Sequence, residues 1–147
     1  MEPLQQGSAV AEIPSLGEEP AAVVFYKVTC PTCQMAAPPM ERLFRAAGER
    51  FAAVVQDPAD RAAEFARQYG TSFPSIPDEE PYDVSRAWGV RVVPTLFVTA
   101  GGRVEDVVES WDREGWARAA ARLGELLGSP MPPPSGEGDG LPPFRPG

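Results

Sequence analysis

Residues 22–33 read AVVFYKVTCPTC, so an unbroken apolar run is followed four residues later by the first of two cysteines. Such a run is typical of a strand that is buried on both faces of a sheet. After Cys33, the apolar residues Met40, Leu43 and Phe44 recur at helical spacing, and Gly48 ends the pattern. The sequence therefore predicts a strand, a pair of cysteines at its end, and a helix that begins at the cysteines.

Strands and helices alternate over the next part of the chain. Residues 51–55 are a second apolar run and predict another buried strand. Asp57-Pro58 predicts a helix start, with Asp57 as the N-cap and Pro58 at the first helical position, and Gly70 marks the helix end. Residues 71–81 are rich in proline and predict an irregular segment before a short helix over residues 82–88.

A hairpin and a last helix are predicted next. Residues 95–98 and 103–108 have the pattern of two strands joined by a turn at residues 100–102, Ala-Gly-Gly. Asp112 is expected to cap the following helix, and Trp111 and Trp116 flank this cap as a hydrophobic staple. The order of elements predicts the α/β class, with a mixed central sheet.

Length and composition indicate one domain. The 147 residues are enough for a hydrophobic core and too few for two ordinary domains. Residues 1–17 lack periodicity and are expected to be a flexible lead-in to a domain over residues 18–128. Proline and glycine dominate residues 129–147, which are expected to be disordered or extended. The net charge of −8 argues against nucleic acid and anionic membranes as partners.

The composition of residues 1–16 and the spacing of the cysteines favour a reducing compartment. Residues 1–16 have no basic start followed by an apolar run, and the longest apolar stretches, residues 21–26 and 95–100, are only strand-sized. We therefore expect a soluble cytoplasmic protein. Its two cysteines are separated by two residues, and in the cytosol such a pair is more often catalytic or metal-binding than structural.

The position of the cysteines favours thiol chemistry. A thiol at a helix N-terminus faces unpaired backbone N–H groups and the positive end of the helix dipole, both of which favour the thiolate. Cys30, at the helix entrance, is expected to attack first, and Cys33, one turn inside, to resolve the mixed disulfide. Pro31 suits the first helical position because it lacks an N–H, and Thr32 completes the motif. Lys27 either adds positive charge near Cys30 or points to solvent as an ordinary strand residue.

Two other interpretations of the cysteine pair stay open. A structural zinc site normally needs four ligands, and the chain has no further cysteine and no histidine, so a partner chain would have to complete it. The pair can also be two inert buried thiols. The redox interpretation is favoured because the CxxC follows a strand and opens a helix in an α/β chain. It requires no metal and no other cofactor.

A second motif surrounds Pro94. Residues 88–98 read WGVRVVPTLFV, and a proline directly before a buried strand either turns the chain through a cis bond or simply opens the strand in trans. The pairing of CPTC with Val93-Pro94-Thr95 is similar to the thioredoxin superfamily. Residues 33–38, CQMAAP, resemble its active-site helix with the kinking proline, and residues 101–104, GGRV, resemble its hairpin turn. The likeness covers roughly residues 20–127.

The resemblance implies a thioredoxin fold, which is a three-layer α/β/α sandwich with a mixed central sheet. About sixty residues separate Cys33 from Pro94, more than in plain thioredoxins. The extra length contains residues 71–78, TSFPSIPD, and resembles the insertion of TlpA-like thioredoxins and of the AhpC/TSA peroxiredoxin group. It lies between the second strand–helix unit and the expected cis-proline.

The resemblance also assigns roles. Cys30 is the implied nucleophile, Cys33 the resolving thiol, and Pro94 a cis residue that faces them and keeps metals off the dithiol. The Val93 backbone is implied to hydrogen-bond an extended substrate segment. The implied partners are protein disulfides and an unidentified electron donor, with the chain acting as a monomer.

Three positions depart from the family pattern. Thr29 stands where thioredoxins usually have Trp, Val24 replaces the buried Asp that assists the second cysteine, and Ala36 replaces the Glu of many TlpA-like proteins. No histidine is available either, so the proton of Cys33 has no evident acceptor. We therefore expect a slower or more specialised reductase than a general thioredoxin.

Three functions are compatible with these residues. The first is a thiol–disulfide oxidoreductase. The second is a peroxiredoxin-like peroxidase, which the insertion favours, although Lys27 stands where that group has Thr or Ser before its cysteine and no Arg is evident near Thr95. The third is a binding or redox-sensing module whose dithiol is not catalytic.

Overall fold

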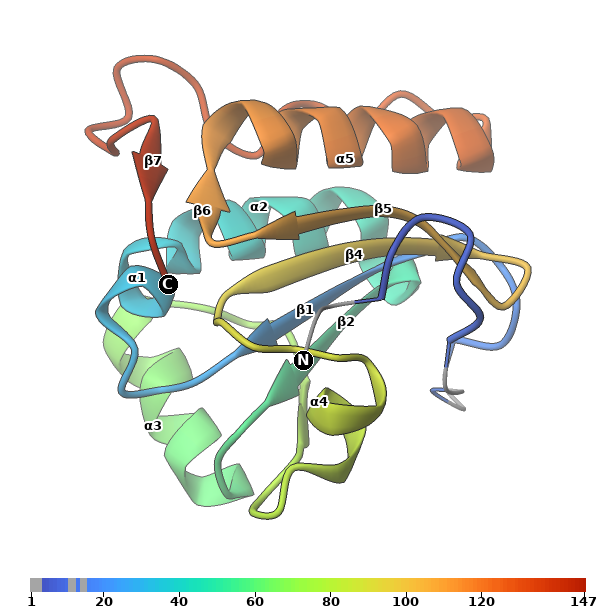
Figure 1. The fold of residues 1–147 in the computed structure, drawn as a ribbon. Helices are drawn as coiled ribbons and strands as arrows, with labels where there is room; N and C mark the ends of the chain where they lie inside the picture. The colour runs from blue at the N-terminus through green and yellow to red at the C-terminus, as the bar shows by residue number, and fades with distance from the viewer. Residues whose placement is uncertain (1–3, 11–12, 14–15) are drawn as a thin grey trace.

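A mixed five-stranded sheet forms the centre of the molecule (Figure 1) in a computed structural model that describes residues 4–10, 13 and 16–147. Its strands lie in the order β3-β2-β1-β4-β5; they are β1 Ala21–Tyr26, β2 Phe51–Val55, β3 Ser75–Pro77, β4 Thr95–Ala100 and β5 Arg103–Glu109. The strands β1, β2 and β3 run parallel, whereas β4 is antiparallel to β1 and to β5. The predicted mixed sheet and the predicted β4–β5 hairpin are confirmed.

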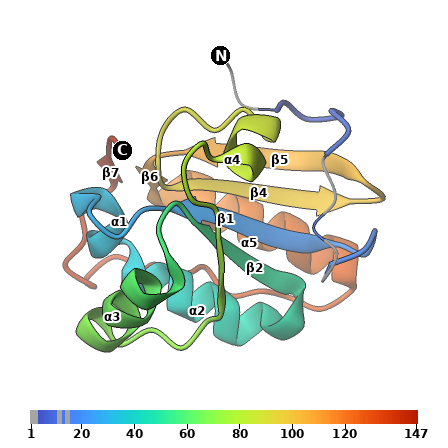
Figure 2. The same cartoon turned by 90° about the horizontal axis from the view of Figure 1, so that it is seen from below.

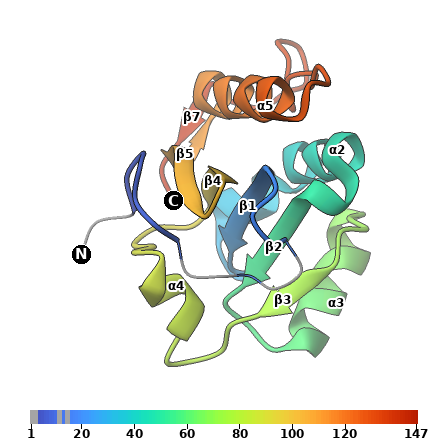
Figure 3. The ribbon, with the colours of Figure 1, turned by 90° about the vertical axis from the view of Figure 1, so that its right-hand side faces the viewer.

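Helices cover both faces of this sheet. They are α1 Pro31–Met35, α2 Ala37–Ala47, the 3-10 turn Gly48–Arg50, α3 Ala59–Tyr69, α4 Asp83–Ala87 and α5 Arg113–Leu127. Figures 2 and 3 show α4 on the side of the sheet opposite to α2 and α5. The predicted α/β/α sandwich is therefore confirmed. Within the described residues, no helix is long and apolar enough to span a bilayer.

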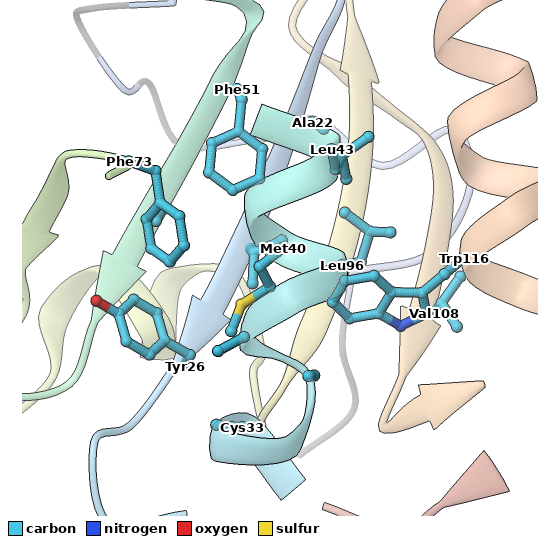
Figure 4. Packing of buried hydrophobic residues seen from close by; sticks show 14 of the residues in the cluster. Ala22, Tyr26, Cys33, Met40, Leu43, Phe51, Phe73, Leu96, Val108 and Trp116 are labelled. Atoms are coloured by element: carbon cyan, nitrogen blue, oxygen red, sulfur yellow. The ribbon is translucent and has the colours of Figure 1, made fainter. Parts of the chain in front are cut away.

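The central strand β1 holds the segment that carries the two cysteines. All six of its residues are buried, because successive side chains enter opposite cores. Val23 and Phe25 pack toward α4, while Val24 and Tyr26 join a larger core with α2, α3 and α5. Cys33 belongs to that larger core, next to Met40 of α2 in Figure 4. The cysteine motif is thus anchored directly to the packed interior.

The insertion before Pro94 is more regular than its proline content suggests. Residues 75–77 add the short edge strand β3 to the sheet, where an irregular segment was expected. Asp78 follows and is buried, and its carboxylate accepts hydrogen bonds from the backbone of Val84 and Ser85 at 3.1 and 2.8 Å. The insertion therefore completes the sheet edge and fixes the start of α4.

Of the two predicted N-terminal helix caps, one is confirmed and the other is wrong. Asp112 caps α5 by accepting from the Gly115 backbone N–H at 3.2 Å, and the rings of Trp111 and Trp116 lie 5.1 Å apart beside it. Asp57 does not cap α3, whose N-cap is Pro58 and has no side-chain hydrogen bond. The Asp57 carboxylate instead accepts from the backbone N–H of Val28 at 2.9 Å, because it follows β2 at the sheet edge where the loop after β1 also lies.

Both ends of the chain form hydrogen bonds with the domain. At the N-terminus, the backbone N–H groups of Leu4 and Gly7 donate to the carbonyls of Trp88 and Val104 at 3.1 and 2.7 Å. Residues 1–3, 11–12 and 14–15 of the expected lead-in lie outside the described residues. The proposed boundaries at residues 18 and 128 stay a prediction.

At the C-terminus, the proline-rich segment returns along α5 toward α1 (Figure 1). The indole N–H of Trp111 donates to the Pro142 carbonyl at 2.8 Å, and the Arg113 guanidinium donates to the Leu141 carbonyl at 2.6 Å. Strand β7, Phe144–Arg145, then pairs antiparallel with β6, Trp111–Asp112. Backbone carbonyls hold this segment, and apolar content alone does not reveal such interactions.

A buried carboxylate joins the insertion to α2 and gives a test of the fold. Glu41 accepts hydrogen bonds from the Ser72 backbone and hydroxyl and from Arg45. Burial alone would raise the pKa of Glu41, but the bonds from Ser72 and Arg45 outweigh it and the pKa is lowered. This stabilisation is therefore present above the unfolded-state pKa of about 4.3 and is lost as the pH falls through the lower folded-state value.

We predict that Glu41→Gln lowers the free energy of unfolding by about 1–2 kcal/mol at pH 7, as measured by urea denaturation. The difference from the wild type should narrow below about pH 4, where the wild-type carboxylate also becomes protonated. Glu64→Gln is the matched control, because Glu64 is exposed and its carboxylate forms only a weak surface ion pair with Arg61, at 4.0 Å. Equal destabilisation of the Glu41 variant at pH 3 and pH 7 would contradict this account.

Candidate active site

Cys30 is the N-cap of α1. Its backbone is extended, with φ −80° and ψ 115°, and Pro31 occupies the first helical position, as predicted. The Cys30 sulfur accepts a hydrogen bond from the backbone N–H of Cys33 at 3.2 Å. The local sequence thus places this sulfur where a helix has free N–H donors.

The two thiols have opposite electrostatic environments. The pKa of Cys30 falls to about 6, and the hydrogen bond from the Cys33 side chain lowers it most. Burial opposes this shift. The backbone N–H groups of Cys33 and Thr32 and the positive charge of Arg145 lower the pKa further. Burial, the hydrogen bond with Cys30 and the charge of Asp57 raise the pKa of Cys33 well above its ordinary value. Cys30 is therefore a thiolate at neutral pH, and Cys33 is a protonated donor to it.

The loop before β4 lies against the reactive sulfur. The Val93 carbonyl is 3.4 Å from the Cys30 sulfur and accepts from its thiol form. The Val93–Pro94 peptide is cis in the structure, and Pro94 is buried. The Pro94 carbonyl accepts from the backbone N–H of Ser110 at 2.8 Å. The structure therefore brings Cys30, Cys33, Val93 and Pro94 together from segments about sixty residues apart.

The remaining residues singled out from the sequence have different surroundings. Pro31 is exposed, while Thr32 is buried and its hydroxyl donates to the Pro146 carbonyl at 2.7 Å. The Lys27 ammonium donates to the Tyr82 hydroxyl at 3.3 Å and lies 5.3 Å from the centre of that ring. Lys27 acts on the site through its backbone instead, which hydrogen-bonds Cys33 and favours its thiolate.

Two functional candidates were missed from the sequence. Asp57 was interpreted as a helix cap, yet it is the carboxylate whose charge acts on Cys33. Its signal was its place directly after a parallel strand adjacent to β1, because the carboxyl ends of parallel strands meet at one sheet edge. Arg145 lies in the proline-rich tail, and no local pattern indicated that its charge acts on Cys30.

The positions that depart from the thioredoxin pattern are apolar or exposed here. Val24 and Ala36 are fully buried in the core, and Thr29 is exposed. Neither buried residue can accept a proton from Cys33. Across the part of the chain that the structure describes, no group of three or more His, Cys, Asp or Glu side chains is arranged to hold a metal ion.

This arrangement of an activated thiolate, a buried partner thiol and a proline loop on a mixed sheet defines the class of thioredoxin-fold dithiol proteins. Residues 5–107 match the model of the AhpC/TSA family, and the chain belongs to that family. No curated protein sequence matches it.

Solved structures of similar fold include redox proteins from several bacteria. A putative protein disulfide isomerase from Bacteroides thetaiotaomicron has a TM-score of 0.75 at 14% identity, covering 88% of this chain and 96% of that one. DsbF of Mycobacterium tuberculosis, solved in mixed oxidized and reduced forms, has a TM-score of 0.64 at 28% identity, covering 74% and 84%. The peroxidoxin BcpB of the same organism has a TM-score of 0.57 at 23% identity, covering 71% and 85%. The chain thus shares its fold with thiol–disulfide oxidoreductases and with a peroxidoxin.

The asymmetry of the two thiols predicts a distinct alkylation profile. We expect iodoacetamide to label Cys30 with a rate that rises around pH 6, while Cys33 stays unlabelled in the folded protein. Labelling followed by peptide mass analysis measures both sites. A midpoint for Cys30 near the ordinary thiol value of about 8.5 would contradict the proposed activation.

Substitution of Cys33 separates the effect of its thiol on the Cys30 pKa from the effect of the helix N-terminus. Cys33→Ala removes the side-chain donor that most lowers the Cys30 pKa, so the pH midpoint of Cys30 labelling should rise. Cys33→Ser keeps a hydroxyl donor and should move it less. If the alanine and serine variants both keep the wild-type midpoint, the thiol of Cys33 is not the activating group.

Proposed function

We propose that the protein is a thiol–disulfide oxidoreductase that reduces or exchanges disulfides in polypeptides through Cys30 and Cys33. The observation that carries this proposal is the pair of opposite pKa shifts in two cysteines at a helix N-terminus, where the backbone N–H of Cys33 donates to the Cys30 sulfur at 3.2 Å. The Cys30 thiolate can attack a disulfide at neutral pH, whereas Cys33 stays protonated until the resolving step. Cytoplasmic location, a monomeric state and an external thiol electron donor belong to the same proposal.

The reaction proceeds in two exchanges. The Cys30 thiolate attacks one sulfur of the substrate disulfide, a mixed disulfide forms, and the other substrate sulfur leaves as a thiolate. Cys33 then loses its proton and attacks the Cys30 sulfur, which forms the Cys30–Cys33 disulfide and releases the second substrate sulfur. Two electrons pass to the substrate, and a dithiol donor returns them to the protein by the reverse sequence.

The resolving step requires a proton acceptor for Cys33. Once Cys30 is bound in a mixed disulfide, it no longer attracts the Cys33 proton as a thiolate. Asp57 is the carboxylate whose charge acts on Cys33, and it is fixed by its bond from the Val28 backbone. We assign Asp57 as the group that receives this proton, directly or through water, while the Lys27 backbone stabilises the resulting thiolate.

Peroxide reduction is the second candidate, because the chain belongs to the AhpC/TSA family and shares its fold with a peroxidoxin. In that reaction the Cys30 thiolate would attack a peroxide oxygen, become a sulfenic acid and release an alcohol or water. Cys33 would then condense with the sulfenic acid to give the same disulfide and one water molecule. Both reactions therefore end at the same oxidised protein and differ in the oxidant.

Turnover assays distinguish the candidates. With dithiothreitol as donor, we predict that the wild type accelerates insulin reduction and that Cys30→Ser reduces it to the uncatalysed background. Cys33→Ser should also stop turnover but accumulate a mixed disulfide between Cys30 and insulin, because the resolving thiol is missing.

The same samples should be tested for hydrogen peroxide consumption. Faster peroxide than insulin turnover would assign the peroxidase activity instead. Inactivity with both substrates would leave a non-catalytic binding or sensing module. Unimpaired insulin turnover by Cys33→Ser would refute the two-cysteine mechanism.

A further inference from the structure

The end of the chain lies on the candidate active site. The strand pairing between β6 and β7 places Arg145 opposite Trp111 and Phe144 opposite Asp112. From there, the chain continues to Pro146 and Gly147, and Figure 1 shows this end beside α1. A segment more than one hundred residues away in sequence thereby reaches the CPTC motif.

Two buried hydroxyl groups hold this end from either side. The Thr32 hydroxyl, between the two cysteines, donates to the Pro146 carbonyl at 2.7 Å. The Ser110 hydroxyl, at the end of the hairpin, accepts from the Gly147 backbone N–H at 3.0 Å. Thr32 and Ser110 are 4% and 8% exposed, so the tail takes part in burying polar groups beside Cys30.

Gly147 packs directly on the backbone of Val93. A Cβ atom at residue 147 would overlap the Val93 carbonyl oxygen, and the Val93 carbonyl carbon would lie within 2.8 Å of it. The same carbonyl oxygen contacts the Cys30 sulfur at 3.4 Å. The tail therefore occupies the backbone position next to the reactive sulfur, where only glycine fits.

We propose that Thr32, Val93 and Ser110 form a docking surface for an extended polypeptide, and that residues 144–147 occupy it until a substrate segment displaces them. The substrate part of this inference rests on the proposed function. An incoming strand that pairs with Val93 needs the space that Gly147 fills, so the two occupants exclude one another. The preferred substrate segment then has a small residue opposite Val93 and a backbone carbonyl for Thr32.

Residues 141–143 and residues 144–147 are held by separate sets of hydrogen bonds. Residues 141–143 accept from Trp111 and Arg113 through three carbonyls, at distances of 2.6–2.9 Å. Residues 142–147 are all exposed, and Phe144 leaves 55% of its surface in water, so little buried surface opposes the release of residues 144–147. The last four residues can therefore leave the site while residues 141–143 stay in place.

The test uses Gly147→Val, which places a side chain against the Val93 carbonyl and leaves Arg145 unchanged. Gly136→Ala is the matched control, because nothing lies within 4 Å of a Cβ at Gly136 and its φ is not positive. The readout is the rate at which a bulky polyethylene-glycol maleimide labels Cys30 at pH 8. We expect a severalfold increase for Gly147→Val and the wild-type rate for Gly136→Ala.

A synthetic peptide LPPFRPG, which corresponds to residues 141–147, provides the reverse test. Added in excess to a variant lacking residues 141–147, it should return the labelling rate toward that of the wild type. Labelling that does not change in Gly147→Val, or that the peptide does not slow, would overturn the proposal. Labelling requires no turnover, so faster labelling without insulin reduction would retain the docking surface and reject the proposed function.

Discussion

The sulfur of Cys30 accepts a hydrogen bond from the backbone N–H of Cys33 at 3.2 Å, because Cys30 is the N-cap of a helix that begins after a buried strand. The other features of the site follow from this position. The sheet fixes the strand, and the core holds Cys33 and disfavours its ionisation. The loop before the antiparallel strand β4 brings the Val93 carbonyl to 3.4 Å from the same sulfur. The conformation at the start of α1 thus produces both the reactive thiol of Cys30 and the protonated thiol of Cys33 that resolves the mixed disulfide.

The sequence was sufficient to predict those parts of the molecule that depend on local patterns. Apolar runs, the CPTC motif and the proline before β4 identified the mixed sheet and the helix at the cysteines. Asp57 was misassigned because an Asp-Pro pair has the same local pattern whether the carboxylate caps its own helix or binds a distant backbone N–H. Only the position of Val28 in the neighbouring loop decides between the two.

The C-terminal tail shows a different limit of sequence analysis. Its composition predicts poor burial of apolar groups, and indeed Phe144 and its neighbours remain exposed. The segment is nevertheless ordered by carbonyls that accept hydrogen bonds from Trp111, Arg113 and Thr32, which are donors distant in sequence. Such interactions have no periodicity, so composition alone cannot anticipate them.

The central claim is that Cys30 and Cys33 interconvert reversibly between a dithiol and an intramolecular disulfide. Equilibration in buffers of reduced and oxidised glutathione, followed by acid quenching, alkylation of the unfolded protein and mass analysis, measures this directly. The account predicts a two-electron transition in which the protein loses two hydrogen atoms and both alkylation sites together, and regains them on reduction. Two thiols that stay alkylatable in oxidised glutathione, or a stable glutathione adduct on Cys30 alone, would contradict it.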